Sequence, residues 1–185
     1  MKRFLMSLII LLFLMLGGGM LFIYSGVYNI AASEPHYPLT RRLVEITVAN
    51  SVKHHAAKVA VPSEFESADR RDGFRLYREM CLICHGAPGT EHSELAEGLR
   101  PEPPELHEDT DDFSPEQTYW IIAHGLKMTG MPAFGESHSE EELWTVTAFV
   151  RDLPELSAEQ WRALDRSVPR QGKEAEGHDH ESHAH

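Results

Sequence analysis

The pentapeptide Cys81-Leu82-Ile83-Cys84-His85 constrains this chain more than any other stretch of its sequence. Two thiols at this spacing can form thioether bonds with the two vinyl groups of one haem, and the histidine that follows can then ligate the iron. The chain has only 2 cysteines, so none remains for a disulfide. The motif therefore predicts one covalent haem c, attached through Cys81 and Cys84, with His85 as the proximal axial ligand.

Two other kinds of site use the same cysteine spacing. A thioredoxin-like redox pair requires a βαβ context, which the sequence around the motif lacks. A structural zinc site requires a second pair of ligands at similar spacing, and the chain has no second cysteine pair. Haem attachment is therefore the favoured interpretation.

The second axial ligand is expected in the segment Gly130-Met131-Pro132. A methionine thioether is a common partner of histidine in single-haem c-type sites. Pro132 restricts Met131 to an extended conformation, which suits a loop that presents one side chain inward. Met128 is the main rival but is not followed by proline. Four histidines are further rivals for the distal position: His92, His107, His124 and His138.

These motifs, with the loop Lys127–Gly135 and the segment Glu142–Val150 around Trp144, resemble a class I monohaem cytochrome c. The most similar subgroup is that of the cbb3-oxidase subunit III-like domains. The resemblance covers about residues 62–166 and includes both axial-ligand motifs in the expected order. It implies a small all-α fold around one haem, acting as an electron carrier rather than an enzyme, and it leaves the redox partners unidentified.

Helix-start signals support an all-α fold. The sequence predicts helices over residues 67–81, 115–124, 140–152 and 158–165, the last three opened by Ser-x-x-Gln or Ser-x-x-Glu capping boxes. Gly73 lies inside the first of these helices, where glycine costs stability. We therefore expect the 140–152 helix to cross close to it. Tyr119 and Trp120 are expected to be core aromatics.

The N-terminus holds an uncharged apolar run from Phe4 to Tyr24. As a helix rising about 1.5 Å per residue, this run spans roughly 30 Å, the thickness of a bilayer core. A cleaved signal peptide is the alternative, with Ala31-Ala32 as a cleavage site, but Ile30 lies where a small residue is wanted. A single-pass anchor is favoured.

The expected organisation is an anchor at 1–24, a linker with a short helix at 25–61, a cytochrome c domain at 62–166 and a disordered tail at 167–185. Charges flanking the anchor do not settle its orientation. The resemblance implies haem attachment outside the cytoplasm, hence a haem domain on the periplasmic side of a bacterial cytoplasmic membrane.

The linker helix, about residues 40–58, carries a valine stripe that could lie against either the membrane surface or the haem domain. Its His54 and His55 are interpreted as exposed polar residues. The acidic run from Glu105 to Asp112 is interpreted as a solvated loop rather than a calcium site, because its spacing does not follow an EF-hand loop.

The net charge of the predicted cytochrome c domain indicates which classes of partner it can bind. Residues 61–170 hold 10 Lys and Arg against 23 Asp and Glu, a net charge of −13. This charge disfavours nucleic acid and favours a redox protein with a basic docking patch. The tail histidines, His178, His180, His183 and His185, could bind metal ions weakly, although a solvated tail is the simpler interpretation.

Two classes of function remain in view, electron transfer and chemistry or sensing at an open iron position. A methionine ligand leaves no open position on the iron, which favours one-electron transfer by a tethered carrier or by a haem subunit of a larger oxidoreductase complex. A haem peroxidase or a gas-binding sensor would need an open iron position. Met131 therefore separates these classes.

Overall fold

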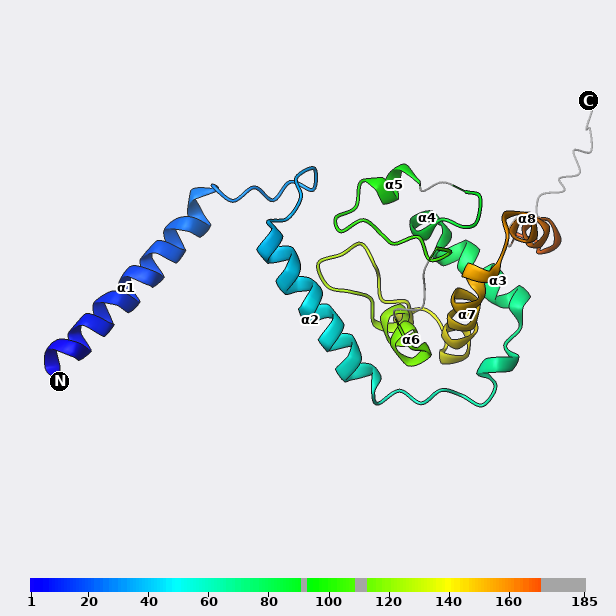
Figure 1. Ribbon diagram of the computed structural model, residues 1–185, viewed down its shortest axis with the longest axis horizontal. Helices are drawn as coiled ribbons and strands as arrows, with labels where there is room; N and C mark the ends of the chain where they lie inside the picture. Colours follow the sequence, from blue (N-terminus) through cyan, green and yellow to red (C-terminus); the bar gives the residue numbers. More distant parts are fainter. Residues whose placement is uncertain (91–92, 109–112, 171–185) are drawn as a thin grey trace, which may run out of the picture. The chain divides into compact units, whose positions relative to one another are not determined.

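The computed structural model describes residues 1–90, 93–108 and 113–170 (Figure 1). The chain divides into two compact units, Met1–His36 and Tyr37–His185. Among the described residues there is no strand, only one isolated bridge between Ala87 and Thr90. The predicted all-α fold is therefore confirmed.

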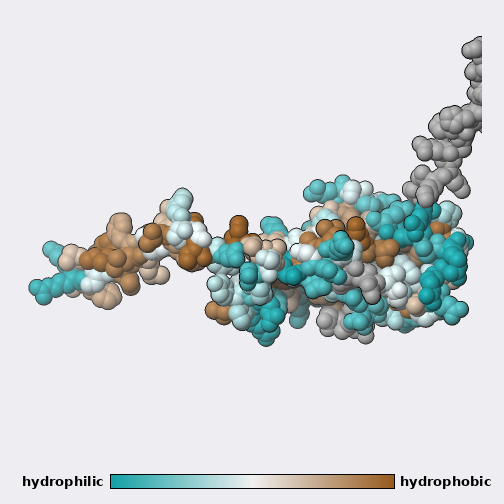
Figure 2. Space-filling view, turned by 90° about the horizontal axis from the view of Figure 1, so that it is seen from above, coloured by the Kyte–Doolittle hydropathy of each residue, from teal (hydrophilic) through white to brown (hydrophobic). Residues whose placement is uncertain are grey.

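The first unit contains one helix, α1 (Lys2–Ser25), which ends at Gly26 with a φ of 67°. Its most apolar window has a mean hydropathy of 2.5, and none of its residues is buried. Figure 2 shows apolar side chains over most of its surface. In length and composition α1 could cross a membrane, and a signal sequence would share both properties.

Within its described residues, the second unit contains the remaining helices and three short 3₁₀ turns. In chain order they are α2 (Pro38–Ala56), η1 (Phe65–Ser67), α3 (Arg70–Met80), α4 (Leu82–His85), α5 (Glu94–Glu97), α6 (Pro115–His124), η2 (Phe134–Glu136), α7 (Glu140–Asp152), η3 (Leu153–Glu155) and α8 (Ala158–Ser167).

Local capping fixes where these helices begin. Helices α6, α7 and α8 each start with a complete capping box, in which Ser114, Ser139 and Ser157 are the N-caps, as the sequence predicts. Helix α3 begins later than the predicted residue 67. The Asp69 carboxylate accepts a hydrogen bond from the Arg71 backbone N–H at 2.7 Å, and the preceding residues form η1 instead.

The predicted close crossing at Gly73 is confirmed. A Cβ atom placed on Gly73 would lie 2.6 Å from the Cβ of Phe149 and 2.9 Å from the backbone oxygen of Thr145. Only glycine lets α3 and α7 approach this closely. The helix of residues 140–152 is thus the one that packs on α3.

Aromatic side chains fill the core around this crossing. Phe74, Tyr77 and Phe149 are at most 1% exposed, and Trp161 from α8 is 4% exposed. The ring centroids of Phe74 and Trp161 are 4.8 Å apart, and those of Tyr77 and Phe149 are 5.6 Å apart. This cluster joins α3, α7 and α8 into one packed body.

The C-terminal half of α2 packs on α6. Val52 and Ala56 are 1% exposed, and the His55 ring stacks on Trp120 with centroids 5.6 Å apart. Trp120 also stacks on His124 at 4.8 Å. Trp120 is half-buried and lies outside the core cluster, so the prediction of a core aromatic does not hold for it. Tyr119 does pack inward, against Trp144 at 4.2 Å.

Candidate haem site

One helical turn carries the two cysteines and the histidine. Cys81 ends α3 and caps α4, and its carbonyl accepts hydrogen bonds from the backbone N–H of Cys84 at 3.0 Å and of His85 at 2.9 Å. Residues three and four positions apart lie on the same face of a helix. The turn therefore presents both thiols and the imidazole to one side.

The imidazole of His85 is held in one tautomer. Its Nδ1 lies 2.8 Å from the carbonyl oxygen of Pro104. A carbonyl can only accept a hydrogen bond, so Nδ1 carries the proton and donates it. This leaves the metal-binding lone pair on Nε2, and a hydrogen bond of this kind orients the ring of a ligating histidine.

A hydrogen bond from Tyr77 also fixes the position of this turn. The Tyr77 hydroxyl donates a 2.7 Å hydrogen bond to the carbonyl of Gly86, and Gly86 ends α4 with a φ of 62°. Desolvation by burial, followed by the charge of Cys81, raises the pKa of Tyr77 well above its ordinary value. The phenol therefore stays protonated and keeps donating to the turn.

The two cysteines differ in exposure. Cys81 is 4% exposed and belongs to the apolar core, whereas Cys84 is half-buried. Desolvation by burial, with a smaller contribution from the charge of Cys84, raises the pKa of the Cys81 thiol to about 12. Cys81 is therefore a neutral thiol at neutral pH and lies on the core side of the turn.

Met131 and its rival Met128 have opposite environments. Met131 is partly buried and packs against the same core cluster that contains Cys81. Its backbone oxygen accepts from Leu126 N at 3.3 Å, and its backbone N–H donates to the Thr129 hydroxyl at 3.1 Å. Met128 is 79% exposed, with a φ of 63°. The loop thus buries one methionine and exposes the other.

Glycine makes this loop possible. Gly125 ends α6 with a φ of 63°, and a Cβ atom there would lie 2.7 Å from the backbone oxygen of Met131. The residue after α6 must therefore be glycine for the Met131 backbone to pass so close.

Three of the rival histidines have partners of their own. The Nδ1 of His124 lies 3.0 Å from the Trp120 carbonyl, and the Nδ1 of His138 lies 3.0 Å from the Ser137 hydroxyl. His107 lies beside Glu105, with 3.4 Å between Nε2 and the carboxylate. His92 lies outside the described residues.

The donor set fits a covalent haem. It offers two thiols and an imidazole on one face of a turn, with the imidazole lone pair on Nε2. A half-buried thioether borders the same core cluster. Haem c uses these donor types: thioether-forming cysteines, a proximal histidine and a methionine.

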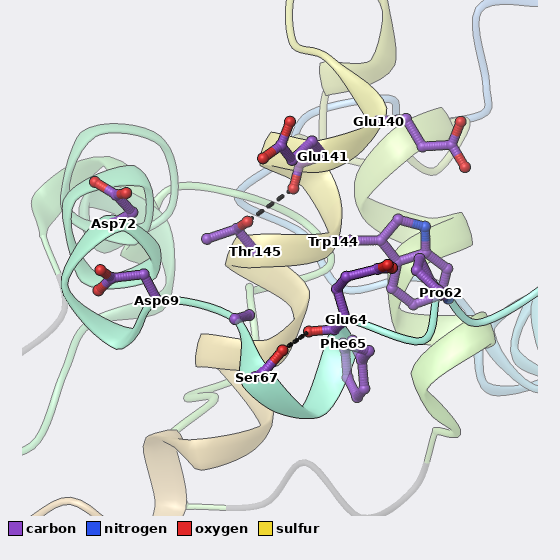
Figure 3. A pocket seen from close by; sticks show the side chains of 11 residues that line it. Pro62, Glu64, Phe65, Ser67, Asp69, Asp72, Glu140, Glu141, Trp144 and Thr145 are labelled. Atoms are coloured by element: carbon purple, nitrogen blue, oxygen red, sulfur yellow. Dashed lines mark hydrogen bonds between the residues drawn. The ribbon is translucent and has the colours of Figure 1, made fainter.

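A separate acidic groove lies away from these residues. It has a volume of about 610 Å³ and is formed where the N-terminal ends of α3 and α7 meet residues 62–69 (Figure 3). Its carboxylates come from Glu64, Asp69, Asp72, Glu140 and Glu141. Cys81 follows the other end of α3, roughly 16 Å along an 11-residue helix, so the groove is not the haem site.

Trp144 lines this groove and is 4% exposed. Its ring stacks on Tyr119 and meets Phe65 edge-on at 5.4 Å. Its buried indole N–H has no hydrogen-bond partner among the described residues.

The acidic loop contains a small cluster of possible metal ligands. The ligand atoms of Glu105, His107 and Glu108 lie within 4.8 Å of one another. Asp109, Asp111 and Asp112 lie outside the described residues, as do the tail histidines His178, His180, His183 and His185. The expectations for the acidic loop as a whole and for the tail therefore stay predictions.

Sequence reasoning missed two residues that hold the site. The sequence shows Pro104 only as one of several prolines that stiffen a loop, because a backbone carbonyl has no sequence signature. It places Tyr77 on an apolar helix face. The polar tip of Tyr77, four residues before Cys81, is a signal that could have suggested a hydrogen bond to the following turn.

Comparison with protein families gives a match over the domain that carries this site. The family described as cytochrome c oxidase, cbb3-type, subunit III matches residues 68–150. The matched region begins just before α3 and ends within α7, so it includes the Cys-x-x-Cys-His turn and the Met131 loop. A search of curated proteins found no match. The chain therefore contains a cytochrome c domain like that of cbb3-type oxidase subunit III, and its role is haem-based electron transfer.

Proposed function

We propose that this protein is a membrane-tethered, periplasmic one-electron carrier with a single covalent haem c. Cys81 and Cys84 hold the haem by thioether bonds, and His85 and Met131 are the axial ligands. When bound, the haem supplies an iron that cycles between two oxidation states.

The hydrogen bond between His85 and Pro104 is the observation that carries this proposal. It fixes the tautomer of an imidazole that sits on the same face as the only two thiols of the chain. The Nδ1 of His124 also lies 3.0 Å from a backbone carbonyl, but His85 shares its helical turn with the two thiols. A ligating histidine gains both orientation and basicity from such a hydrogen bond.

The environments of the two methionines support Met131 as the sixth ligand. A side chain that packs against the core cluster can reach a group bound beside Cys81, whereas Met128 extends into solvent. With both axial positions filled, the site has no place for a substrate. This favours electron transfer over a peroxidase or a gas sensor.

The membrane tether is proposed from the properties of α1. Its length, its mean hydropathy of 2.5 and its lack of buried residues suit a single membrane span. We expect the protein to stay in the membrane fraction after a high-salt wash, because salt weakens charge contacts but does not extract a spanning helix. A mature N-terminus near Ser33 would contradict the anchor and indicate a cleaved signal peptide.

The negative surface suggests how the domain docks with a redox partner. With a net charge of −13 over residues 61–170, the domain attracts a partner with a basic patch. The carboxylates of the acidic groove are part of this charge. The rate of electron exchange with such a partner should fall as ionic strength rises.

The family match favours a variant of this proposal, in which the protein is a subunit of a larger oxidoreductase complex. The matched family is named for a subunit of an oxidase. Native gel electrophoresis of mildly solubilised membranes separates the two forms, because a free carrier migrates alone and a subunit migrates with its complex.

Mass and redox measurements on the purified full-length chain test the proposal. We expect a mass equal to the chain plus one haem that survives denaturation, reversible one-electron reduction and a low-spin spectrum. Release of all haem on denaturation would refute covalent attachment. A high-spin iron that binds small ligands without displacing a protein ligand would favour the peroxidase or sensor class.

A further inference from the structure

Helix α2 has two apolar faces, and only one of them is covered. Val52 and Ala56 lie on the face that packs on α6 and are 1% exposed. Leu39, Leu43 and Ile46 share a second face and are 71%, 57% and 44% exposed. At 3.6 residues per turn, this second face points roughly 130° away from the first. The second face therefore cannot pack on α6, which the first face contacts.

The exposed face differs from other exposed apolar residues of the same unit. Ile83 and Leu95 are exposed on α4 and α5, and Met128 is exposed in the loop after α6. Single exposed apolar residues are ordinary on a protein surface. Three on one face, spaced i, i+4 and i+7, form the stripe typical of a helix that covers an apolar surface.

Charge identifies the kind of surface. Helix α2 carries Arg41, Arg42 and Lys53 against Glu45, on a chain with a net charge of −12. The side chains of Arg41 and Arg42 are 71% and 73% exposed and approach Glu45 only at 3.7 and 3.9 Å. Such exposed pairs are weak, so both guanidinium groups can meet another anion.

Arg42 and Lys53 lie within about 70° of the stripe around the helix axis, whereas Arg41 lies nearly opposite it. An apolar stripe with cationic side chains at its edge suits the boundary between headgroups and acyl chains of an anionic bilayer. A second copy of the chain fits poorly, because it would bring the same cationic face against this one.

We propose that the N-terminal half of α2 lies in the interface of an anionic lipid bilayer, with Leu39, Leu43 and Ile46 directed into it. The C-terminal half meanwhile holds α6 through Val52, Ala56 and His55. Helix α2 then fixes the orientation of the cytochrome c domain on the membrane instead of acting as a loose linker. This inference rests on the proposed tether, because α1 brings the chain to the lipid.

Two leucines of nearly equal exposure allow a matched test. Leu43 is 57% exposed on α2, and Leu95 is 54% exposed on α5. Each is replaced by cysteine in the full-length holoprotein, Leu43→Cys or Leu95→Cys, and labelled with an environment-sensitive fluorophore. The labelled chains are reconstituted into phosphatidylcholine vesicles containing phosphatidylglycerol, with a nitroxide quencher on the lipid or iodide in the water.

We expect lipid nitroxide to quench the label at position 43 about threefold more than the label at position 95, with iodide showing the reverse order. Equal quenching at the two positions would overturn the inference. Shielding of position 43 from both quenchers would also overturn it, because a protein surface would then cover the stripe.

Vesicle flotation separates the two proposals. Chains that float but show no lipid quenching at position 43 would refute the orientation and leave the tether intact. Chains that do not float would refute the tether, and the inference with it.

Discussion

The crossing of α3 and α7 is held together differently from the residues that we propose to face the haem. These residues, Cys84, His85 and Met131, are called the haem-facing stretch. At the crossing, Phe74, Val146 and Phe149 are at most 1% exposed and interlock directly. In the haem-facing stretch, Cys84, His85 and Met131 are only half-buried. Single hydrogen bonds hold it, such as those from His85 to Pro104 and from Tyr77 to Gly86.

The difference indicates what each region needs in order to be ordered. The crossing buries its own apolar surface and depends only on side chains that fit. In our proposal the haem-facing stretch supplies donors and a partial lining, and the haem completes its packing. Substitutions in the two regions test this contrast, from the largest expected effect to the smallest.

Removing both thiols should have the largest effect. The double variant Cys81→Ala with Cys84→Ala should carry no covalent haem. Because a bound cofactor stabilises the folded state and the core of so small a domain is limited, we expect most of its helix to be lost. Haem staining after denaturing electrophoresis and far-ultraviolet circular dichroism measure the two effects. A haem-free double variant with full helix content would contradict the contrast.

Changing Gly73 should destabilise the crossing itself. In Gly73→Ala the new Cβ atom must displace Phe149 and the Thr145 carbonyl. Overpacking of about 3 kcal/mol, reduced by about 1 kcal/mol of helix propensity, leaves a loss of about 2 kcal/mol. Denaturant unfolding of the holoprotein measures it.

Gly98→Ala is the matched control for this substitution. The nearest atoms to a Cβ atom on Gly98 are 3.5 and 3.6 Å away, and its φ of −80° suits alanine. Its stability should change by less than about 0.5 kcal/mol. Equal stabilities of the two variants would mean that the crossing is not tightly packed.

The smallest effect concerns a helix cap. Ser139→Ala removes the hydroxyl that accepts from the Glu142 N–H at 3.3 Å and donates to the Glu142 carboxylate at 2.9 Å. We expect a loss of about 1 kcal/mol at neutral pH. Hydrogen bonds from the Ser139 backbone N–H and then its hydroxyl hold the pKa of Glu142 below its ordinary 4.5.

The sign of the pH effect follows from that lowered pKa. Stabilisation by the Glu142 carboxylate is present above the unfolded-state pKa and is lost as pH falls through the folded-state value. The cost of Ser139→Ala should therefore shrink below pH 4.5. Ser157→Ala removes the same kind of cap with neutral Gln160 as its partner, so its cost should not follow this titration. If the stability costs of both substitutions changed with pH in the same way, the assignment of this effect to Glu142 would be wrong.

Locally determined features could be predicted from the sequence. The starts of α6, α7 and α8 follow from capping residues within four positions of each other, so no long-range contact is needed. The crossing at Gly73 was also predictable, because glycine destabilises a helix interior and is therefore expected where a neighbouring backbone needs the space. The cysteine motif indicated the cofactor because all of its chemistry lies within five residues.

Features that depend on distant partners were not predictable. Trp120 is covered by His55, which lies far from it in the sequence, and the valine pattern of α2 fits a membrane and a protein surface equally well. The partner of His85 is a backbone carbonyl 19 positions away. The choice between Met128 and Met131 rested on Pro132 alone, and their different burial now favours the same residue.

The central claim is that His85 and Met131 are the two axial ligands of the haem iron. The most direct test is the near-infrared charge-transfer band that a methionine sulfur gives with oxidised haem iron. We predict that Met131→Ala abolishes this band while Met128→Ala retains it, because the Met128 side chain is 79% exposed. Loss of the band in Met128→Ala and its survival in Met131→Ala would contradict the account.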